Sequence, residues 1–257
     1  MKPSKMRIHP IQETASPLPL HWNVPRLVIS FSQPVSKGQI ALLRASLLDM
    51  AELRWDRYPT TFWNLEAAIK EAKKFTGIPL IVTLRSAKEG GQWNASETER
   101  RRLFYALLPY AHFVDIELAS VTKLAGVIDR AKAQGRAIIL SCHAWDCTPP
   151  LGVLERLRDR AEQKGADLIK IVTMAQTRKD VQQLARFTLS HTTGPRLITF
   201  AMGPLGLSSR LLFPALGSVL SYSYLGAPTA PGQLAYPEMA RVFARLYPER
   251  REARRLP

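Results

Sequence analysis

Short apolar segments alternate with amphipathic segments along nearly the whole chain, and this alternation constrains the fold most strongly. Short apolar runs bounded by Gly, Pro or polar residues are typical of buried strands, and apolar residues at helical spacing predict helices between them. The chain contains eight such strand candidates and eight helix candidates. This order predicts parallel strands joined by crossover helices, and eight repeats favour a closed (β/α)8 TIM barrel over an open sheet.

The limits of the expected elements follow from these patterns. Strands are expected at residues 27–31, 50–55, 79–83, 113–118, 137–141, 168–172, 196–202 and 219–222. Local signals mark several helices, such as the capping box of Ser96 and Glu99 and the glycine at Gly77 that ends a helix. We expect one barrel domain at residues 26–248, an extended leader at 1–25 and a basic tail at 249–257.

The chain is strongly basic, with a formal net charge of +15. Such a charge attracts either nucleic acid or an anionic small substrate. The basic residues are spread along the sequence, with the densest group at residues 250–255, and no RNA-binding aromatic motif or zinc-finger spacing accompanies them. The pattern is typical of a solvated basic surface, so it disfavours a nucleic-acid partner.

The sequence also bears on compartment and cofactors. No apolar run is long enough to span a bilayer, and residues 1–25 have no apolar core like that of a secretory signal. The two cysteines, Cys142 and Cys147, are too few for a disulfide framework or a zinc site. We therefore expect a cytoplasmic protein that has no membrane contact and no structural metal.

One expected strand contains a charged residue where burial is expected. The apolar run at residues 168–172 continues past Lys170 without a polar break. Burial of an ammonium group is costly, so the pKa of Lys170 is expected to fall toward neutrality. A partly neutral lysine can attack a carbonyl carbon and form an imine. Taken alone, the segment also fits a lysine at a strand end whose charged head reaches water.

Further unusual residues stand near the carboxyl ends of the expected strands, where (β/α)8 barrels place their chemistry. These positions are Glu52, Arg54, Arg85, Glu117, His143, Lys170, Met202 with Gly203, and the loop after Tyr222. A period of two also predicts that Glu52, Arg54 and Asp56 share one face of their strand. Polar residues at so many strand ends indicate one shared site.

Seven segments resemble, in order, the motifs of type I 3-dehydroquinate dehydratases. They are residues 52–56 with the pattern E-x-R-x-D, 83–91, 114–118, 141–143, the strand of Lys170, 202–203 with Ser209 and Arg210, and 227–233. One such motif would carry little weight, whereas seven in the same order are specific. The resemblance extends from about residue 27 to the end of the last expected helix.

The resemblance implies a hydro-lyase of the shikimate pathway that converts 3-dehydroquinate to 3-dehydroshikimate and water without a metal or an organic cofactor. Lys170 would form an imine with the substrate ketone, and this imine serves as an electron sink. His143 would remove a proton and later return one to the leaving hydroxyl, as suits a group that titrates near neutral pH. Glu89 would orient His143, and Glu117 is expected near Lys170 as a supporting carboxylate.

The resemblance also implies how the substrate is held. Arg210 and Arg85 would bind its carboxylate and hydroxyl groups, because the guanidinium fork suits bidentate recognition. Glu52 and Arg54 would hold the ring hydroxyls, and Ser30 joins them.

Thr229 and Gln233 lie in a loop punctuated by Pro and Gly that would close over the ligand and exclude water. The family usually has Ser at the position of Thr229, so the hydroxyl is retained. Cys142 and Ala144 flank His143, where the family usually has an aromatic or polar residue before the histidine and Asp or Asn after it. The family also implies a homodimer.

Two other interpretations stay open. A class I aldolase-like barrel also uses a buried lysine, but the E-x-R-x-D strand and the loop at 227–233 argue against it. A barrel of the same family that has lost catalysis could bind RNA or a protein through its basic surface. The presence of both Lys170 and His143 disfavours that interpretation.

Overall fold

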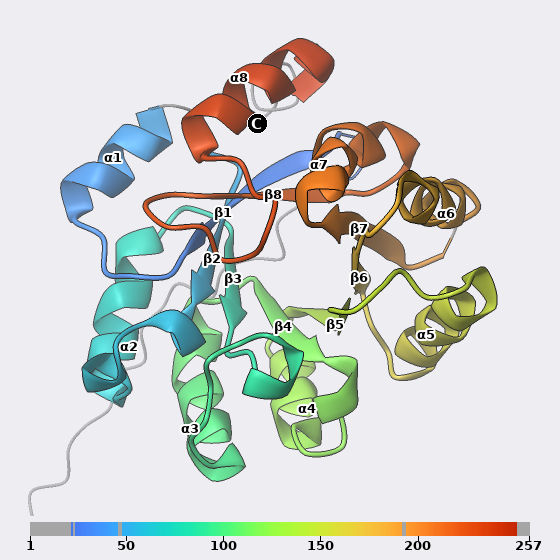
Figure 1. The fold of residues 1–257 in the computed structure, drawn as a ribbon. Coiled ribbons are helices and arrows are strands. Elements are labelled where there is room, and N and C mark those ends of the chain that lie inside the picture. Colours follow the sequence, from blue (N-terminus) through green and yellow to red (C-terminus); the bar gives the residue numbers. More distant parts are fainter. Residues whose placement is uncertain (1–21, 23, 46–47, 192–193, 251–257) are drawn as a thin grey trace, which may run out of the picture.

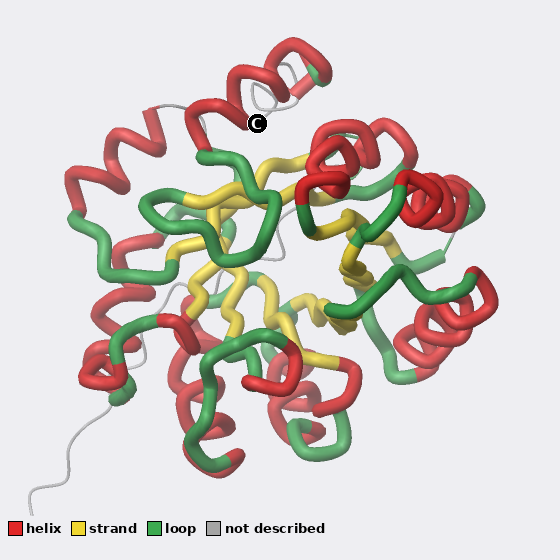
Figure 2. The backbone as a smooth tube through the Cα atoms, in the orientation of Figure 1, coloured by secondary structure: helices red, strands yellow, loops and turns green. Residues whose placement is uncertain are grey.

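The protein forms a barrel of eight parallel strands surrounded by helices (Figures 1 and 2). The computed structural model describes residues 22, 24–45, 48–191 and 194–250. The strands are β1 (Arg26–Phe31), β2 (Met50–Arg54), β3 (Leu80–Thr83), β4 (Phe113–Glu117), β5 (Ala137–Ala144), β6 (Leu168–Met174), β7 (Arg196–Met202) and β8 (Leu220–Tyr224). The helices are α1 (Lys37–Ala45), α2 (Leu65–Ala72), α3 (Glu97–Leu107), α4 (Ala125–Ala133), α5 (Leu151–Gln163), α6 (Arg178–Leu189), α7 (Leu207–Leu212) and α8 (Tyr236–Leu246).

The sheet has the order β7-β6-β5-β4-β3-β2-β1-β8, and its two ends meet at a seam. There Val219 N donates to Leu197 O at 2.8 Å, and Thr199 N donates to the hydroxyl of Ser218 at 2.9 Å. The strands therefore close into a (β/α)8 barrel, which confirms the predicted fold class. Because the paired strands are parallel, their carboxyl ends meet at one rim.

Alternate residues of each strand face the helix layer and the barrel interior. In β6, Ile169 and Ile171 pack in the cluster shared with the helices, whereas Leu168 and Val172 belong to a second cluster inside the barrel. Lys170 follows the interior register and is 4% exposed. The expectation of a buried lysine in this strand is thus confirmed.

The helix ends predicted from local sequence signals are also found in the structure. Ser96 and Glu99 form the predicted capping box at the start of α3, and Thr177 with Asp180 forms another before α6. After α2 the chain makes a 3-10 turn over Lys73–Phe75 and reaches Gly77, which has a φ of 79°. Glycine suits this left-handed position because it has no Cβ.

Most strand limits differ from the expectation by one or two residues, and differences in β2 and β5 affect the site. β2 ends at Arg54, and Trp55–Arg57 form a 3-10 turn, so Asp56 does not share the strand face of Glu52. The pairing of β2 with β3 stops at Arg54, after which the turn brings the Asp56 carboxylate back onto the Arg54 guanidinium. β5 is longer than expected and runs on to Ala144, which places His143 inside the strand.

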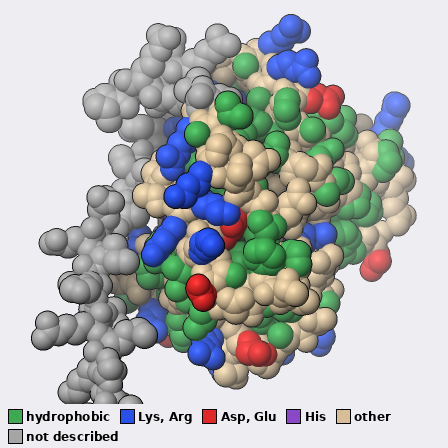
Figure 3. All heavy atoms as spheres, turned by 90° about the vertical axis from the view of Figure 1, so that its left-hand side faces the viewer, with side chains coloured by type: hydrophobic (Ala, Val, Ile, Leu, Met, Phe, Trp, Pro, Cys, Tyr) green, Lys and Arg blue, Asp and Glu red, His purple; other side chains and the backbone are tan. Residues whose placement is uncertain are grey.

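Lys and Arg side chains gather on the face of the molecule over α1 and α2 (Figure 3). Lys37, Lys70 and Lys73 are exposed there and line a shallow groove with Lys74. Exposed lysines of this kind fit the expected solvated basic surface. No helix in the described part of the chain combines the length and apolar character needed to cross a membrane.

Most of the expected leader and tail, residues 1–21, 23 and 251–257, lies outside the described residues. Trp22 packs edge-on against Phe113, with 6.0 Å between ring centroids. In the first part of the expected tail, the guanidinium of Arg250 is buried and forms an ion pair with Asp49. This arginine belongs to the packed barrel and not to the solvated surface.

Candidate active site

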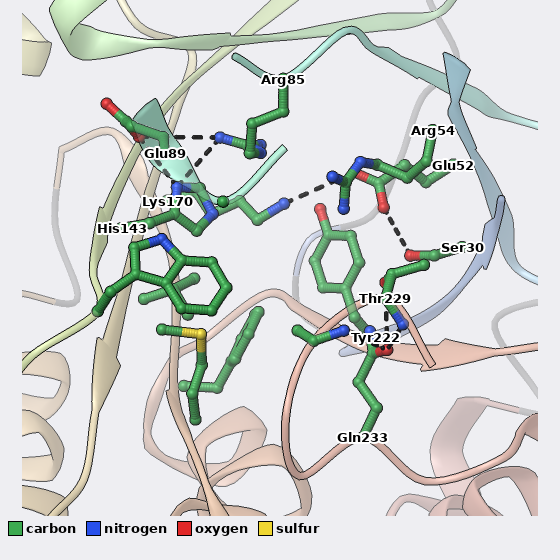
Figure 4. A pocket seen from close by; sticks show the side chains of 16 residues that line it. Ser30, Glu52, Arg54, Arg85, Glu89, His143, Lys170, Tyr222, Thr229 and Gln233 are labelled. Carbon is green, nitrogen blue, oxygen red and sulfur yellow. Dashed lines mark hydrogen bonds and ion pairs between the residues drawn. The ribbon is translucent and has the colours of Figure 1, made fainter. Parts of the chain in front are cut away.

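Side chains that lie far apart in the sequence meet in a pocket at the carboxyl rim of the barrel (Figure 4). All of the predicted catalytic and substrate-binding residues except Arg210 line this pocket, and the expected supporting carboxylate Glu117 does not. They converge because parallel strands end at one rim, so that Ser30 of β1 and Lys170 of β6 reach the same space. The pocket therefore brings together the residues that the sequence motifs had indicated.

Lys170 lies at the base of the pocket between two carboxylates. Its Nζ is 2.9 Å from Oδ2 of Asp115 and 3.7 Å from Oε1 of Glu52. Although burial alone would raise it, the charges of Arg85 and Lys170 hold the pKa of Asp115 well below its usual range. Asp115 is therefore ionised beside the amine, where its charge stabilises an ammonium.

The expectation that Glu117 supports Lys170 is wrong in its choice of residue. The Glu117 carboxylate pairs with Arg100 at 2.5 Å and accepts a hydrogen bond from Ser86 N at 2.6 Å. Arg100 is fully buried in α3 and requires an anionic partner, so it draws Glu117 away from the amine. Asp115, two residues earlier on the same strand, takes the role that was assigned to Glu117.

Glu52 is held by hydroxyl groups on both of its oxygens. Ser30 donates to Oε2 at 2.5 Å, and Thr83 donates to Oε1 at 2.9 Å. Ser30 lies opposite Glu52 on β1, and Thr83 is on β3, which pairs with the other edge of β2. This arrangement fixes the carboxylate at the pocket wall, within reach of Lys170.

Two arginines at the rim are each fixed by a carboxylate. Arg54 forms a bidentate pair with Asp56, at 3.0 and 2.9 Å. Arg85 donates to Oδ1 of Asp115 at 2.8 Å and to the hydroxyl of Ser141 at 2.9 Å. Their guanidinium groups are therefore held in fixed directions at the pocket wall before any ligand arrives.

His143 on β5 lies between Glu89 and Arg85. Its Nδ1 is 3.1 Å from Oε2 of Glu89 and 3.0 Å from Nη1 of Arg85. Burial, with the charges of Arg85 and Lys170, holds the pKa of His143 well below its usual range, so the ring is neutral near pH 7. Burial raises the pKa of Glu89 to about 7. The histidine is thus a neutral base beside a carboxyl that changes its charge near neutral pH.

Arg210 of α7 lies beside the pocket, under the loop that follows β8. Its Nη2 donates to Pro231 O at 3.3 Å, and its guanidinium stands 4.3 Å from the ring centroid of Phe200, which lines the pocket. Its Nε and Nη1 are buried without a hydrogen-bond partner among the described residues. Burial lowers the pKa of Arg210 to about 9. A buried cation with unpaired hydrogen-bond donors is suited to bind an anionic group of a ligand.

The loop over the pocket is held by Gln233. Its Oε1 accepts hydrogen bonds from Thr229 N at 2.6 Å, from the Thr229 hydroxyl at 3.1 Å and from Ala230 N at 3.1 Å. Gly232 has a φ of 75°, and a Cβ there would lie 2.5 Å from Gly203 O. Glycine is required because the loop packs against the end of β7. The loop is thus a formed structure that borders the pocket.

Several pocket residues were not predicted from the sequence as site residues. The main ones are Trp145, Val172, Phe200 and Tyr222. Val172 and Tyr222 follow the inward register of their strands, so strand periodicity could have indicated them. Trp145 follows the end of β5, so the alternation of residues along that strand does not predict the direction of its side chain. In the described part of the chain, no group of three or more His, Cys, Asp or Glu side chains is placed to hold a metal ion.

The fold and the site define an enzyme of the (β/α)8-barrel class that is built around a buried lysine and a neutral histidine. The model of the family Type I 3-dehydroquinase matches residues 33–249. The chain is 33% identical over 195 residues to the 3-dehydroquinate dehydratase of Thermodesulfovibrio yellowstonii, covering 76% of this chain and 84% of that protein. It is 37% identical over 208 residues to that of Methanosarcina acetivorans, covering 77% and 85%.

A solved structure agrees with these relatives. The crystal structure of 3-dehydroquinate dehydratase from Geobacillus kaustophilus superposes with a TM-score of 0.75 at 28% identity, over 86% of this chain and 91% of that chain. The family match spans most of the sequence and includes β2 to β8, whereas β1 with Ser30 precedes it. This chain belongs to the type I 3-dehydroquinase family.

Proposed function

We propose that this chain converts 3-dehydroquinate to 3-dehydroshikimate and water through an imine on Lys170, as a hydro-lyase of the shikimate pathway. The observation that carries the proposal is the lysine itself, which is buried at the base of a pocket and faces a neutral histidine base. The family and its named relatives support the same reaction.

In the first step, the amine of Lys170 attacks the ketone carbon of the substrate. The attacking amine has to be neutral, so the ammonium must lose a proton before the attack, and the Asp115 carboxylate at 2.9 Å holds the amine in position. The protonated imine that results draws electrons from the neighbouring carbon. Removal of a proton from that carbon then gives a neutral enamine in place of a costly enolate.

His143 is the group placed to remove that proton. Its Nδ1 can either donate to Glu89 or accept from Arg85, because one ring nitrogen has room for one hydrogen bond. A hydrogen on Nδ1 that points to Glu89 leaves Nε2 free to act as the base. The same nitrogen can then deliver the proton to the leaving hydroxyl.

The substrate carboxylate is assigned to Arg210. Its Nε and Nη1 hydrogens have no partner in the described structure, and burial strengthens any charge-assisted bond that they form. Pro231 O holds the third nitrogen and so ties the guanidinium to the loop over the pocket. A bound carboxylate would thereby connect α7 with that loop.

Incubation with 3-dehydroquinate tests the proposal directly. The product is a conjugated enone acid that absorbs in the ultraviolet, so absorbance should rise with time and stop at a fixed ratio of substrate to product. A protein that leaves 3-dehydroquinate unchanged but cleaves a sugar phosphate would be an aldolase, and the proposal would be wrong.

Arg210→Lys is expected to weaken substrate binding while leaving the chemistry largely intact. Lysine keeps the charge but loses the planar fork, so KM should rise by about tenfold to 10²-fold with a smaller change in kcat. Steady-state kinetics would measure both constants. Arg102→Lys, on the exposed face of α3, is the matched control and should change neither. An unchanged KM for Arg210→Lys would place the carboxylate elsewhere.

The charge of Glu89 should set the pH dependence of the reaction. Because the pKa of Glu89 is raised to about 7, its carboxylate is present above this pH and is lost as the pH falls through it. The rate should therefore drop below about pH 7, since a protonated Glu89 no longer provides the negative charge that stabilises His143 as it takes up a proton. Glu89→Gln should be slow and lack this inflection, whereas Glu66→Gln, exposed on α2, should keep it. The same inflection in Glu89→Gln would assign it to another group.

The homodimer and the cytoplasmic location stay predictions, the first from the resemblance and the second from the composition. The bound partner that this proposal requires is a small anionic substrate. The positive surface over α1 and α2 would favour the approach of such a molecule.

A further inference from the structure

Tyr222 places a free hydroxyl group inside the pocket, and no step described above uses it. The residue lies on β8, is 2% exposed and lines the pocket. The centroid of its ring is 4.1 Å from Nζ of Lys170. Figure 4 shows the phenol rising from β8 with its oxygen directed toward the space between Lys170 and Glu52. The phenol thus borders the part of the pocket in which a carbonyl group attacked by the lysine would be bound.

The Tyr222 hydroxyl is buried without a hydrogen-bond partner among the residues that the structure describes. A buried polar group left unpaired costs free energy, so native proteins pair nearly all such groups with protein, water or ligand. Burial and the nearby negative charges of Glu52 and Asp115 raise the pKa of Tyr222 well above its usual range. The phenol therefore keeps its proton and is available as a hydrogen-bond donor.

We propose that Tyr222 donates a hydrogen bond to the ketone oxygen of the substrate while Lys170 attacks the adjoining carbon, and so is a further catalytic residue. The proposal rests on the imine chemistry proposed for Lys170. In the addition product, the former ketone oxygen is bonded to the same carbon as Nζ. That oxygen consequently lies close to Nζ, in the region where the phenol oxygen stands.

The step balances without a further reactant. A bond forms between Nζ and the ketone carbon, and the electron pair of the carbonyl π bond moves to the oxygen. Two of the three protons of the Lys170 ammonium finally leave with that oxygen as water, and the third remains on the protonated imine. Tyr222 keeps its own proton throughout, because it stabilises the growing negative charge on the oxygen by hydrogen bonding alone.

Other groups near Nζ are less suited to this task. Asp115 is ionised, so it has no proton to donate, and Glu52 accepts two hydroxyl hydrogens. The guanidinium of Arg85 is engaged by Asp115 and Ser141. Tyr222 combines a retained proton, a free donor direction and a ring placed against Nζ.

Exchange of the ketone oxygen with water isolates this step. The His143→Ala variant should form and hydrolyse the imine without proceeding to dehydration, and each cycle replaces the ketone oxygen by one from the solvent. The experiment compares His143→Ala with His143→Ala/Tyr222→Phe in ¹⁸O-labelled water and follows ¹⁸O in recovered 3-dehydroquinate by mass spectrometry. Tyr222→Phe removes one oxygen atom and leaves the ring beside Lys170.

We expect Tyr222→Phe to slow the exchange at saturating substrate by about 10²-fold, as for removal of one donor from a developing oxyanion. His143→Ala/Tyr224→Phe is the matched control, because Tyr224 is on the same strand but does not line the pocket, and its exchange should match that of His143→Ala. Equal exchange with and without the Tyr222 hydroxyl, or an effect confined to substrate affinity, would overturn the proposal. Absence of exchange in His143→Ala, together with failure of borohydride to trap a ligand on Lys170 in the unaltered protein, would refute the imine and the role of Tyr222 with it. If Lys170 is trapped although His143→Ala shows no exchange, the same comparison of exchange rates is made between the unaltered protein and Tyr222→Phe alone.

Discussion

Lys170→Ala is expected to abolish both turnover and covalent capture of the substrate. Without the amine no imine forms, and the loss of a covalent catalyst costs on the order of 10⁵-fold to 10⁶-fold in rate. In the unaltered protein, borohydride reduces the carbon–nitrogen double bond to a stable amine. Addition of 3-dehydroquinate and borohydride should therefore inactivate it and add one ligand mass to the peptide that contains Lys170.

Two further variants separate the loss of chemistry from a loss of structure. Lys170→Met fills nearly the same volume, and Asp115 keeps its ion pair with Arg85 at 2.8 Å, so this variant should fold while remaining inactive. Lys88→Ala removes an exposed lysine from the loop that carries Glu89 and should be trapped as efficiently as the unaltered protein. Full activity in Lys170→Ala, or a ligand mass on another lysine, would contradict the assignment.

The barrel could be predicted because its signals are local and repeated. The apolar run around Lys170 shows a strand whatever its neighbours are, and the capping box of Ser96 and Glu99 marks the start of α3 within four residues of sequence. The end of β2 could not be obtained in this way. Its pairing stops at Arg54, which lies opposite Thr83, the last residue of β3. The end of β2 is therefore set by the neighbouring strand and not by the sequence of β2 itself.

The partner of Lys170 shows a second limit of sequence reasoning. Asp115 and Glu117 have the same charge and face the same way on β4, so the sequence offers no reason to prefer one. The choice depends on Arg100, which is buried on α3 and takes the Glu117 carboxylate. That contact joins two elements across the sheet and helix layers, and a period of two along one strand contains no information about it.

The proposed ligand-binding roles of Tyr222 and Arg210 could not be recognised from their residue types alone. A tyrosine in a strand usually packs in a core, and a lone arginine usually forms a surface ion pair. The structure distinguishes both from these common cases, because each has polar atoms that are buried without a partner among the described residues. These unpaired atoms border the pocket. We therefore expect a bound ligand to provide the hydrogen-bond partners that the described residues do not provide.

His143→Ala is expected to form the imine and yet turn over very slowly. Lys170 and its partner Asp115 are unchanged by the substitution, so borohydride should still add one ligand mass to Lys170. Loss of a general acid–base group typically costs ~10²-fold to 10⁴-fold, and kcat should fall within that range. The contrast between intact trapping and lost turnover is the test, and mass spectrometry with steady-state kinetics on one sample measures both.

Cys142→Ser is the matched control for His143→Ala. Burial raises the pKa of the neighbouring Cys142 thiol to about 11, so it is not ionised near neutral pH, and the side chain does not line the pocket. This variant should retain turnover and trapping alike. If His143→Ala turned over at nearly the normal rate, another group would have to move the proton. If it turned over slowly and trapped no ligand, His143 would be needed for imine formation as well.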